Sequence, residues 1–193
     1  MNLDRRWTKF PITCLFLSLA LSASAVASSI TFKITLPANQ RPITGRMFVI
    51  IARANDPEPR LQVGSWRSRT EMLAVDVQGL QPGQAATLDA LTLGYPMKSV
   101  RELPAGDYYV QGLLNVYTRF QRSDGNVIWA HMDQWEGQQF NKSPGNLFTE
   151  IGHFHLDPLT GYEIRLSLDH KIPTPLPPGV PIRIGKTVLE LRK

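Results

Sequence analysis

The stretch Leu103–Phe120, LPAGDYYVQGLLNVYTRF, decides the fold of this chain. Pro104 restricts φ and Gly106 tolerates positive φ, so residues 104–107 are typical of a turn. The residues that follow are rich in aromatic and β-branched types, which favour a strand. Side chains alternate between two faces of a strand. One face is nearly all apolar and is predicted to point into the core, with Tyr108, Val110, Gly112, Leu114 and Val116. The other is predicted to point outward or to line a groove, with Tyr109, Gln111, Leu113, Asn115 and Tyr117.

A tight reversal follows this strand. Residues 122–126, RSDGN, contain the Asp-Gly pair that is typical of hairpin turns. Residues 127–132 then read as a returning strand, so the sequence predicts a β-hairpin over residues 107–132.

The N-terminus has the pattern of a secretory signal peptide. Basic residues precede an apolar run over residues 12–25, and Ala25-Val26-Ala27 is a small-x-small cleavage pattern. The run is shorter than the roughly 20 residues that a transmembrane helix needs. We therefore expect a secreted or periplasmic protein cleaved after Ala27, with Ala25 as the alternative, and no membrane association after cleavage.

The composition excludes several classes of function. Cys14, the single cysteine, lies inside the apolar run and leaves with the signal peptide, so no disulfide is expected. The net charge is +5, and losing Arg5, Arg6, Lys9 and Asp4 leaves about +3. The chain has no lysine-rich run, so it is not expected to bind nucleic acid. About 165 residues suffice for a stable core without disulfides. We expect a monomer.

The rest of the chain reads as short strands separated by Gly- and Pro-containing turns. Residues 30–36 alternate, residues 47–52 are continuously apolar and predicted to be buried on both faces, and residues 55–70 form a polar loop with Trp66. Residues 86–93 are predicted as a strand that ends at Gly94-Tyr95-Pro96. Residues 150–156 and 162–168 are predicted to pair as a second hairpin.

These patterns predict an all-β fold, an immunoglobulin-like β-sandwich of about eight or nine strands. The sandwich domain spans residues 28–170, after the signal peptide at 1–27. Residues 171–193 then form a proline-rich linker and a terminal strand.

Residues 133–148, DQWEGQQFNKSPGNLF, show neither helical nor strand periodicity. Long loops on a rigid sheet often carry binding surfaces. The amides and aromatics of this loop would suit a saccharide or peptide ligand. They would suit equally well a loop that packs on itself. The candidate ligand-binding residues are Tyr109, Tyr117, Trp135, Gln138, Asn141 and Asn146.

Catalytic motifs are absent from the sequence. There is no G-x-S-x-G nucleophile elbow and no phosphate-binding glycine loop, so neither catalytic residues nor a cofactor is assigned. The histidines offer a weaker alternative. His153 and His155 share one face of a predicted strand, and His131 completes a candidate set for a metal-dependent enzyme.

The strings LPAGDYYVQGLLNVYTRF, RSDG and DQWEGQQFNKSPGNLF resemble the N-terminal domain of secreted bacterial esterases of the enterochelin-esterase type. The resemblance covers residues 30 to about 170. It implies a β-sandwich that precedes an α/β-hydrolase domain, and an accessory role beside that domain or another secreted protein. No catalytic residue of the family has a counterpart here, so esterase activity is not carried over.

Three functions follow as hypotheses. The first is a non-catalytic secreted accessory or interaction module. The second is a saccharide- or peptide-binding module that uses the 133–148 loop. The third is a metal-dependent enzyme at His131, His153 and His155.

Signal cleavage gives the first testable prediction. N-terminal sequencing of the protein recovered from the periplasmic or secreted fraction should begin at Ser28, because cleavage follows Ala27. A sequence that begins at Met1 would contradict export through this segment.

Overall fold

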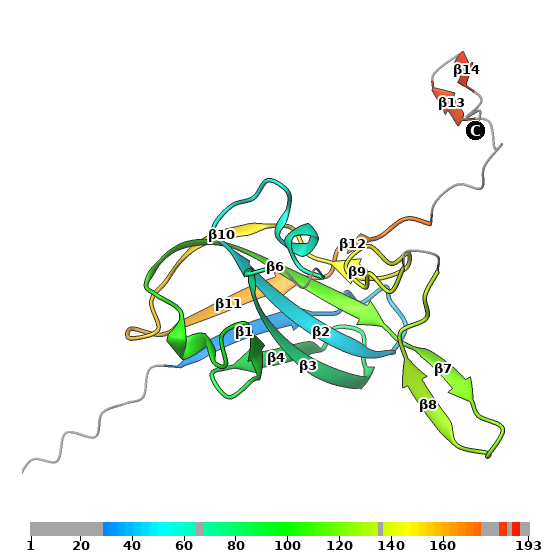
Figure 1. The fold of residues 1–193 in the computed structure, drawn as a ribbon, viewed down its shortest axis with the longest axis horizontal. Helices are drawn as coiled ribbons and strands as arrows, with labels where there is room; N and C mark the ends of the chain where they lie inside the picture. The colour runs from blue at the N-terminus through cyan, green and yellow to red at the C-terminus, as the bar shows by residue number, and fades with distance from the viewer. Residues whose placement is uncertain (1–28, 65–67, 135–136, 175–181, 185–186, 190–193) are drawn as a thin grey trace, which may run out of the picture.

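The computed structural model describes residues 29–64, 68–134, 137–174, 182–184 and 187–189. This part of the chain is all-β, as predicted, apart from the short 3-10 turns η1 (Pro59–Gln62) and η2 (Val100–Glu102). The predicted signal peptide, Trp66, Trp135 and residues 175–181 of the linker lie outside the described residues. Two sheets pack face to face as a sandwich (Figure 1).

The smaller sheet has three strands, in the order β11 (Tyr162–Ser167), β1 (Ile30–Thr35) and β4 (Ala85–Asp89). β1 lies in the centre, parallel to β11 and antiparallel to β4. Its alternation follows the sequence, because Ile30, Phe32 and Ile34 are buried while Thr31, Lys33 and Thr35 face outward.

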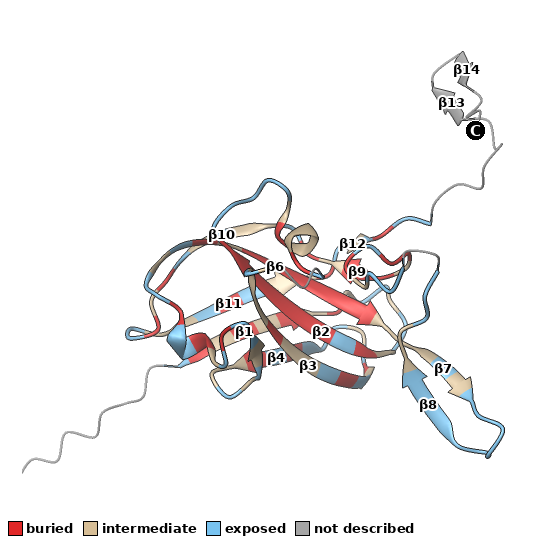
Figure 2. Cartoon of the chain, in the orientation of Figure 1, coloured by how far each residue is buried: buried red, intermediate tan, exposed pale blue. Residues whose placement is uncertain are grey.

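The larger sheet is built around β2 (Ile43–Ala52) and β6 (Gly106–Val116), which pair antiparallel. Its order is β12 (His170–Lys171), β9 (Leu147–Phe148), β6, β2, β3 (Glu71–Leu80) and β5 (Gly94–Tyr95), and β10 (Gly152–Leu156) also pairs with β6. Residues 47–52 are all buried, which confirms the strand predicted to be buried on both faces. Figure 2 shows the buried residues concentrated on β2 and β6.

The main core fills the space between the two sheets. Phe32 and Ile34 of β1 meet Val49 of β2 and Leu114 of β6 in one apolar cluster. Gly112 permits this close approach, since a Cβ there would lie 2.8 Å from the Ile34 side chain. The predicted core face of β6 is therefore confirmed.

A tyrosine corner anchors the start of β6. The Tyr108 hydroxyl donates a 2.6 Å hydrogen bond to the Pro104 carbonyl, four residues upstream. Such corners recur in β-sandwiches, where they fix the turn that enters a central strand. The LPAGDY sequence thus forms the predicted turn and locks it to the core.

The hairpin predicted over residues 107–132 is wrong in its first strand. β6 does not take part, and the hairpin consists of β7 (Thr118–Gln121) and β8 (Val127–Ala130) alone. Both edges of β6 are already occupied, by β2 on one side and by β9 and β10 on the other. The β7–β8 hairpin instead extends away from the two sheets (Figure 1).

The second predicted hairpin is also wrong. β10 and β11 do not pair with each other, because β10 pairs with β6 in the larger sheet and β11 with β1 in the smaller one. The turn between them is formed, with the Gly161 amide donating to the Asp157 carbonyl at 3.0 Å. It carries the chain from one sheet to the other.

Two strand ends also differ from the sequence prediction. β4 stops at Asp89, because the Thr92 amide donates to the Asp89 carbonyl and turns the chain. Gly94-Tyr95, predicted as a break, forms the short strand β5 against β3. Near the C-terminus, β13 (Ile182–Ile184) and β14 (Thr187–Leu189) form a hairpin where one strand was predicted.

The second face of β6 is covered rather than open, which corrects the prediction for Gln111, Leu113 and Asn115. All three are buried. Residues 53–64 and 137–146 lie over this face, where Val63 and Phe140 pack in a second apolar cluster with Leu113. The loop predicted over residues 55–70 is polar in sequence, yet it contributes to a core through Val63.

Buried side-chain amides hold these loops on the sheet. Asn146 Oδ1 accepts a 2.8 Å hydrogen bond from the Val116 amide, and its Nδ2 donates to the Phe140 carbonyl at 2.7 Å and to Asn115 Oδ1 at 3.1 Å. Gln111 Nε2 likewise donates to Glu58 and to the Thr149 carbonyl.

Replacing Asn146 tests this anchoring. Asn146→Ala should lower the free energy of unfolding by about 2–4 kcal/mol, because buried donors and acceptors lose their partners. Urea denaturation measures the change. Asn39→Ala, an exposed amide in the β1–β2 turn, is the matched control and should have little effect. Equal stability of the two variants would show that the amide does not hold the loop.

Candidate functional site

The structure disperses the five candidate ligand-binding residues that it describes. Asn141 and Asn146 are buried, and Asn141 Nδ2 donates to the carbonyls of Arg60 and Val63 at 3.0 and 2.9 Å. Their amides hold loops together. Gln138 is exposed, with a positive φ of 63°. Trp135 lies outside the described residues.

The described part of the 133–148 loop packs on the protein itself. The Phe140 ring stacks on Phe48, with centroids 4.6 Å apart and planes at 20°. With Asn141 and Asn146 buried beneath it, the self-packing alternative from the sequence accounts for this part of the loop.

The two candidate tyrosines lie far apart on β6 and its extension. Tyr109 stacks on His153 of β10, with centroids 4.6 Å apart. Tyr117 follows the other end of β6, eight residues along a strand that rises about 3.4 Å per residue. Only Tyr117 borders an open hollow among the pockets described below.

Of the three candidate metal ligands, His153 and His155 share the exposed face of β10, as predicted, but His131 lies far from them. His155 Nδ1 lies 2.9 Å from Asp107 at the start of β6, whereas His131 Nδ1 lies 2.9 Å from Asn115 near its end. Asp107 and Asn115 are eight residues apart, or about 27 Å along the strand. Among the described residues, no group of three potential metal ligands comes together.

The open part of the larger sheet's outer face contains an ion pair. Arg46 of β2 and Asp76 of β3 are opposite each other in the register, and both are exposed. Arg46 Nε and Nη2 donate to the two carboxylate oxygens of Asp76 at 2.7 and 3.0 Å. This bidentate geometry fixes both side chains.

The ion pair also shifts the acidity of its members. The hydrogen bond from Arg46 lowers the pKa of Asp76 below its ordinary value, and the same bond raises the pKa of Arg46. Burial raises the pKa of nearby Tyr117. The pair is therefore fully ionised at neutral pH, and Tyr117 keeps its hydroxyl proton.

A hollow lies on each side of this pair. The first, of about 260 Å³, is lined by Thr44, Gly45, Asp76, Val77, Gln78, Tyr117 and Trp129. The second, of about 290 Å³, is lined by Arg46, Phe48, Met72, Ala74, Leu93, Gly94 and Tyr95. We refer to the two hollows and the ion pair between them as the β2–β3 strip.

Aromatic side chains stand at both ends of the β2–β3 strip. Trp129 of β8 is 44% exposed and Tyr95 of β5 is 56% exposed. From Met72, which pairs with Tyr95, to Gln78 the strip follows β3 for six residues, or about 20 Å. The strip thus combines flat apolar surfaces with polar groups held in fixed positions.

Sequence reasoning missed Trp129, Tyr95, Arg46 and Asp76. Arg46 and Asp76 are 30 residues apart, and each looks like an ordinary polar residue of a strand. The detectable signal was Trp129 itself, an aromatic residue in a short strand after a polar turn. Its place beside Tyr117 depends on a hairpin register that the sequence did not supply.

No family model matches the chain, and no curated protein matches it either. The structure therefore classifies the chain by its fold alone, which is an all-β sandwich. None of the helices in the described residues is long and apolar enough to cross a membrane.

The ion pair gives a pH-dependent prediction. Because the Arg46 hydrogen bond is the main cause of the shift, Arg46→Gln should raise the pKa of Asp76 back toward 3.8. An NMR titration of the Asp76 carboxyl carbon measures it. Because the pKa of Asp76 is lower in the folded state, its ionisation stabilises the fold at pH values above the ordinary pKa of an aspartate. That stabilisation is lost as the pH falls through the folded-state pKa of Asp76. Arg41→Gln, on an exposed turn, is the control and should leave the titration of Asp76 unchanged. Equal titration curves for the unaltered protein and both variants would contradict Arg46 as the cause of the shift.

Proposed function

We propose that the chain is an exported, non-catalytic module that binds an uncharged saccharide along the β2–β3 strip. The observation that carries this proposal is the pair of exposed aromatic residues, Trp129 and Tyr95, at the two ends of a strip whose central charges neutralise each other.

The chemistry of the strip matches that of a sugar chain. A pyranose ring has apolar C–H groups on its faces and hydroxyls around its edge. Aromatic rings such as Trp129 and Tyr95 offer a large apolar surface at little conformational cost. Asp76 and Gln78, on the same face of β3, present acceptors and donors for hydroxyls.

The charge balance favours a neutral ligand. Arg46 and Asp76 are fully paired, so an incoming anion or cation would have to compete with a bidentate ion pair. Hydroxyl groups can instead share the free lone pairs of the Asp76 carboxylate without breaking that pair.

A peptide fits the strip less well. Extended peptides usually add as a strand to a sheet edge, where main-chain hydrogen bonds supply affinity. The strip lies on the face of β2 and β3, and the main chain of β2 is paired on both sides. Of the two ligands that the sequence suggested, a saccharide therefore fits the strip better than a peptide.

The strip also lacks the arrangement that sugar cleavage uses. Glycosidases place two carboxyl groups on opposite sides of the scissile bond. Among the described residues that line the two hollows, Asp76 is the only carboxylate. A binding role therefore fits the strip better than a hydrolytic one.

The signal-like N-terminus and the resemblance to the N-terminal domain of secreted esterases support an accessory role. In that role the module would hold an esterase domain, or another exported protein, against a glycan that carries the ester. The accessory role is supported by the sequence, and the sandwich fold is compatible with it.

An array of neutral and acidic glycans, followed by calorimetry of the neutral oligosaccharides that bind, tests the proposal. Trp129→Ala should weaken binding at least about tenfold, which corresponds to about 1.4 kcal/mol, because the sugar loses its aromatic platform. Binding by the unaltered protein should persist down to about pH 4, since Asp76 stays ionised.

Ile128→Ala is the matched control. Ile128 is the neighbour of Trp129 on β8, is 42% exposed, and points to the opposite side of the hairpin. It should leave affinity unchanged. Failure of every neutral glycan to bind, or equal losses in the two variants, would refute a saccharide site here.

A further inference from the structure

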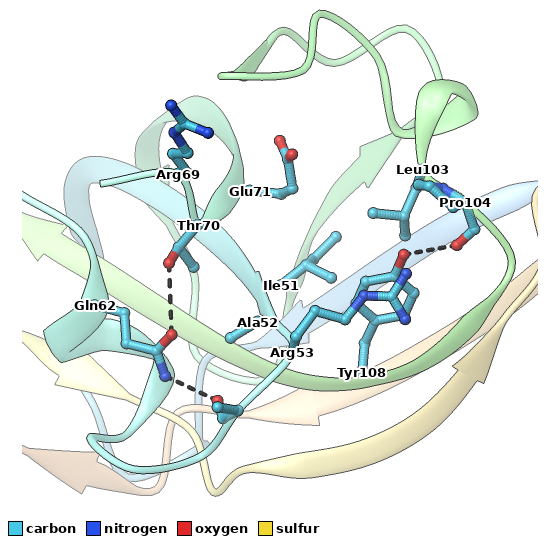
Figure 3. Close-up of a pocket in the computed structure, with 11 residues that line it drawn as sticks. Ile51, Ala52, Arg53, Gln62, Arg69, Thr70, Glu71, Leu103, Pro104 and Tyr108 are labelled. Carbon is cyan, nitrogen blue, oxygen red and sulfur yellow. Dashed lines mark hydrogen bonds between the residues drawn. The ribbon is translucent and has the colours of Figure 1, made fainter. Parts of the chain in front are cut away.

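A third pocket lies at the end of the sandwich where the main core reaches the surface. It has a volume of about 430 Å³ and is formed by the last residues of β2, the first of β3 and the turn before β6 (Figure 3). Its floor is apolar, with Ile51, Ala52, Leu103 and Pro104, and its polar lining comprises Arg53, Gln62, Arg69, Thr70, Glu71 and Tyr108.

Arg53 is held in place by aromatic and main-chain contacts rather than by a carboxylate. Its guanidinium carbon lies 3.7 Å from the centroid of the Tyr108 ring, and Nη1 donates to the Asp107 carbonyl at 3.2 Å. The ring is itself fixed by the hydroxyl bond to Pro104. Gly106 leaves room for this arrangement, since a Cβ there would lie 2.6 Å from Nη1.

Arg69 stands across the apolar floor from Arg53 (Figure 3). Its side chain is exposed and makes no hydrogen bond or ion pair within the described residues. Glu71, the one carboxylate lining the described pocket, has its Oε2 occupied by the amide of Met97 at 2.9 Å. The pocket therefore carries two cations and one anion, a net positive charge.

We propose that this pocket binds a carboxylate carried on a small apolar body. The unengaged N–H groups of Arg53 and Arg69 would receive the carboxylate, a pairing that guanidinium groups make with two parallel hydrogen bonds. The apolar body would rest on Ile51, Ala52 and Leu103. The C-terminus of a peptide and a free organic acid share this chemistry.

The carboxylate pocket is independent of the β2–β3 strip. Arg53 directly follows β2 and is seven residues from Arg46, or about 24 Å along an extended chain. The two arginines also differ chemically, because Arg46 is paired with Asp76 and Arg53 has no carboxylate partner among the described residues.

Calorimetry with N-acetyl-leucine and N-acetyl-leucinamide tests the proposal on the full chain. The acid should bind at least about tenfold more tightly than the amide, because only the acid offers a charged partner to the arginines. Arg69→Gln should lower the affinity for N-acetyl-leucine at least about fivefold. This variant removes no hydrogen bond or ion pair within the described residues, so it should fold normally.

Arg41→Gln removes the same charge from a distant exposed turn and is the matched control. Equal binding of acid and amide, no binding of either, or equal effects of Arg69→Gln and Arg41→Gln would overturn the proposal. Trp129→Ala should leave acid binding intact, which separates this result from that of the saccharide test.

A tripeptide distinguishes the two sources of the carboxylate. N-acetyl-Gly-Gly-Leu that binds more tightly than N-acetyl-leucine supports a peptide C-terminus as the ligand. Equal or weaker binding of the tripeptide acid supports a small organic acid.

Discussion

The fold depends on the burial of β2 and β6 on both of their faces. One face of each strand packs against the smaller sheet, and the other would expose Phe48, Ile50 and Leu113 to water if nothing covered it. Covering it requires irregular chain, whose main-chain polar groups need partners once water is excluded. Gln111, Asn141 and Asn146 supply many of those partners. The buried amides are thus a consequence of the doubly buried strands.

This cover is incomplete, and its limit determines where the outer surface remains available. It spans β6 and the adjoining part of β2 but stops short of the Arg46–Asp76 pair on β2 and β3. The strip left open is polar at its centre and aromatic at its ends, whereas the pocket at the end of the sandwich has two guanidinium groups with no carboxylate partner in the part of the chain that the structure describes. One sandwich therefore presents two surfaces of different chemistry, a neutral one on a sheet face and a positive one at the end of the sandwich.

Local pattern was enough to predict the core between the two sheets, because burial there follows strand periodicity, but it missed the second apolar cluster on the outer face of β6. The apolar run at 47–52 and the core face of β6 followed directly from it. Strand partners were not predictable in the same way, since neighbouring segments in sequence need not pair. The sequences of β10 and β11 are typical of a hairpin, but β10 pairs with the edge of β6 and β11 pairs with the edge of β1. The same limitation hid the strip: Arg46 and Asp76 meet only through the β2–β3 register, and Trp129 reaches Tyr117 only because β8 has no place beside β6.

The central position of β1 bears on when the domain can fold. β1 is the first strand of the described chain, yet its parallel partner β11 lies some 130 residues later, as the Lys33–Glu163 ion pair illustrates. Contacts between segments this distant close large loops and form slowly. The smaller sheet cannot be completed until nearly the whole domain has left the ribosome, so an early-emerging β1 has an unsatisfied edge. Late completion of the smaller sheet would keep the chain unfolded during the export that the N-terminal sequence predicts.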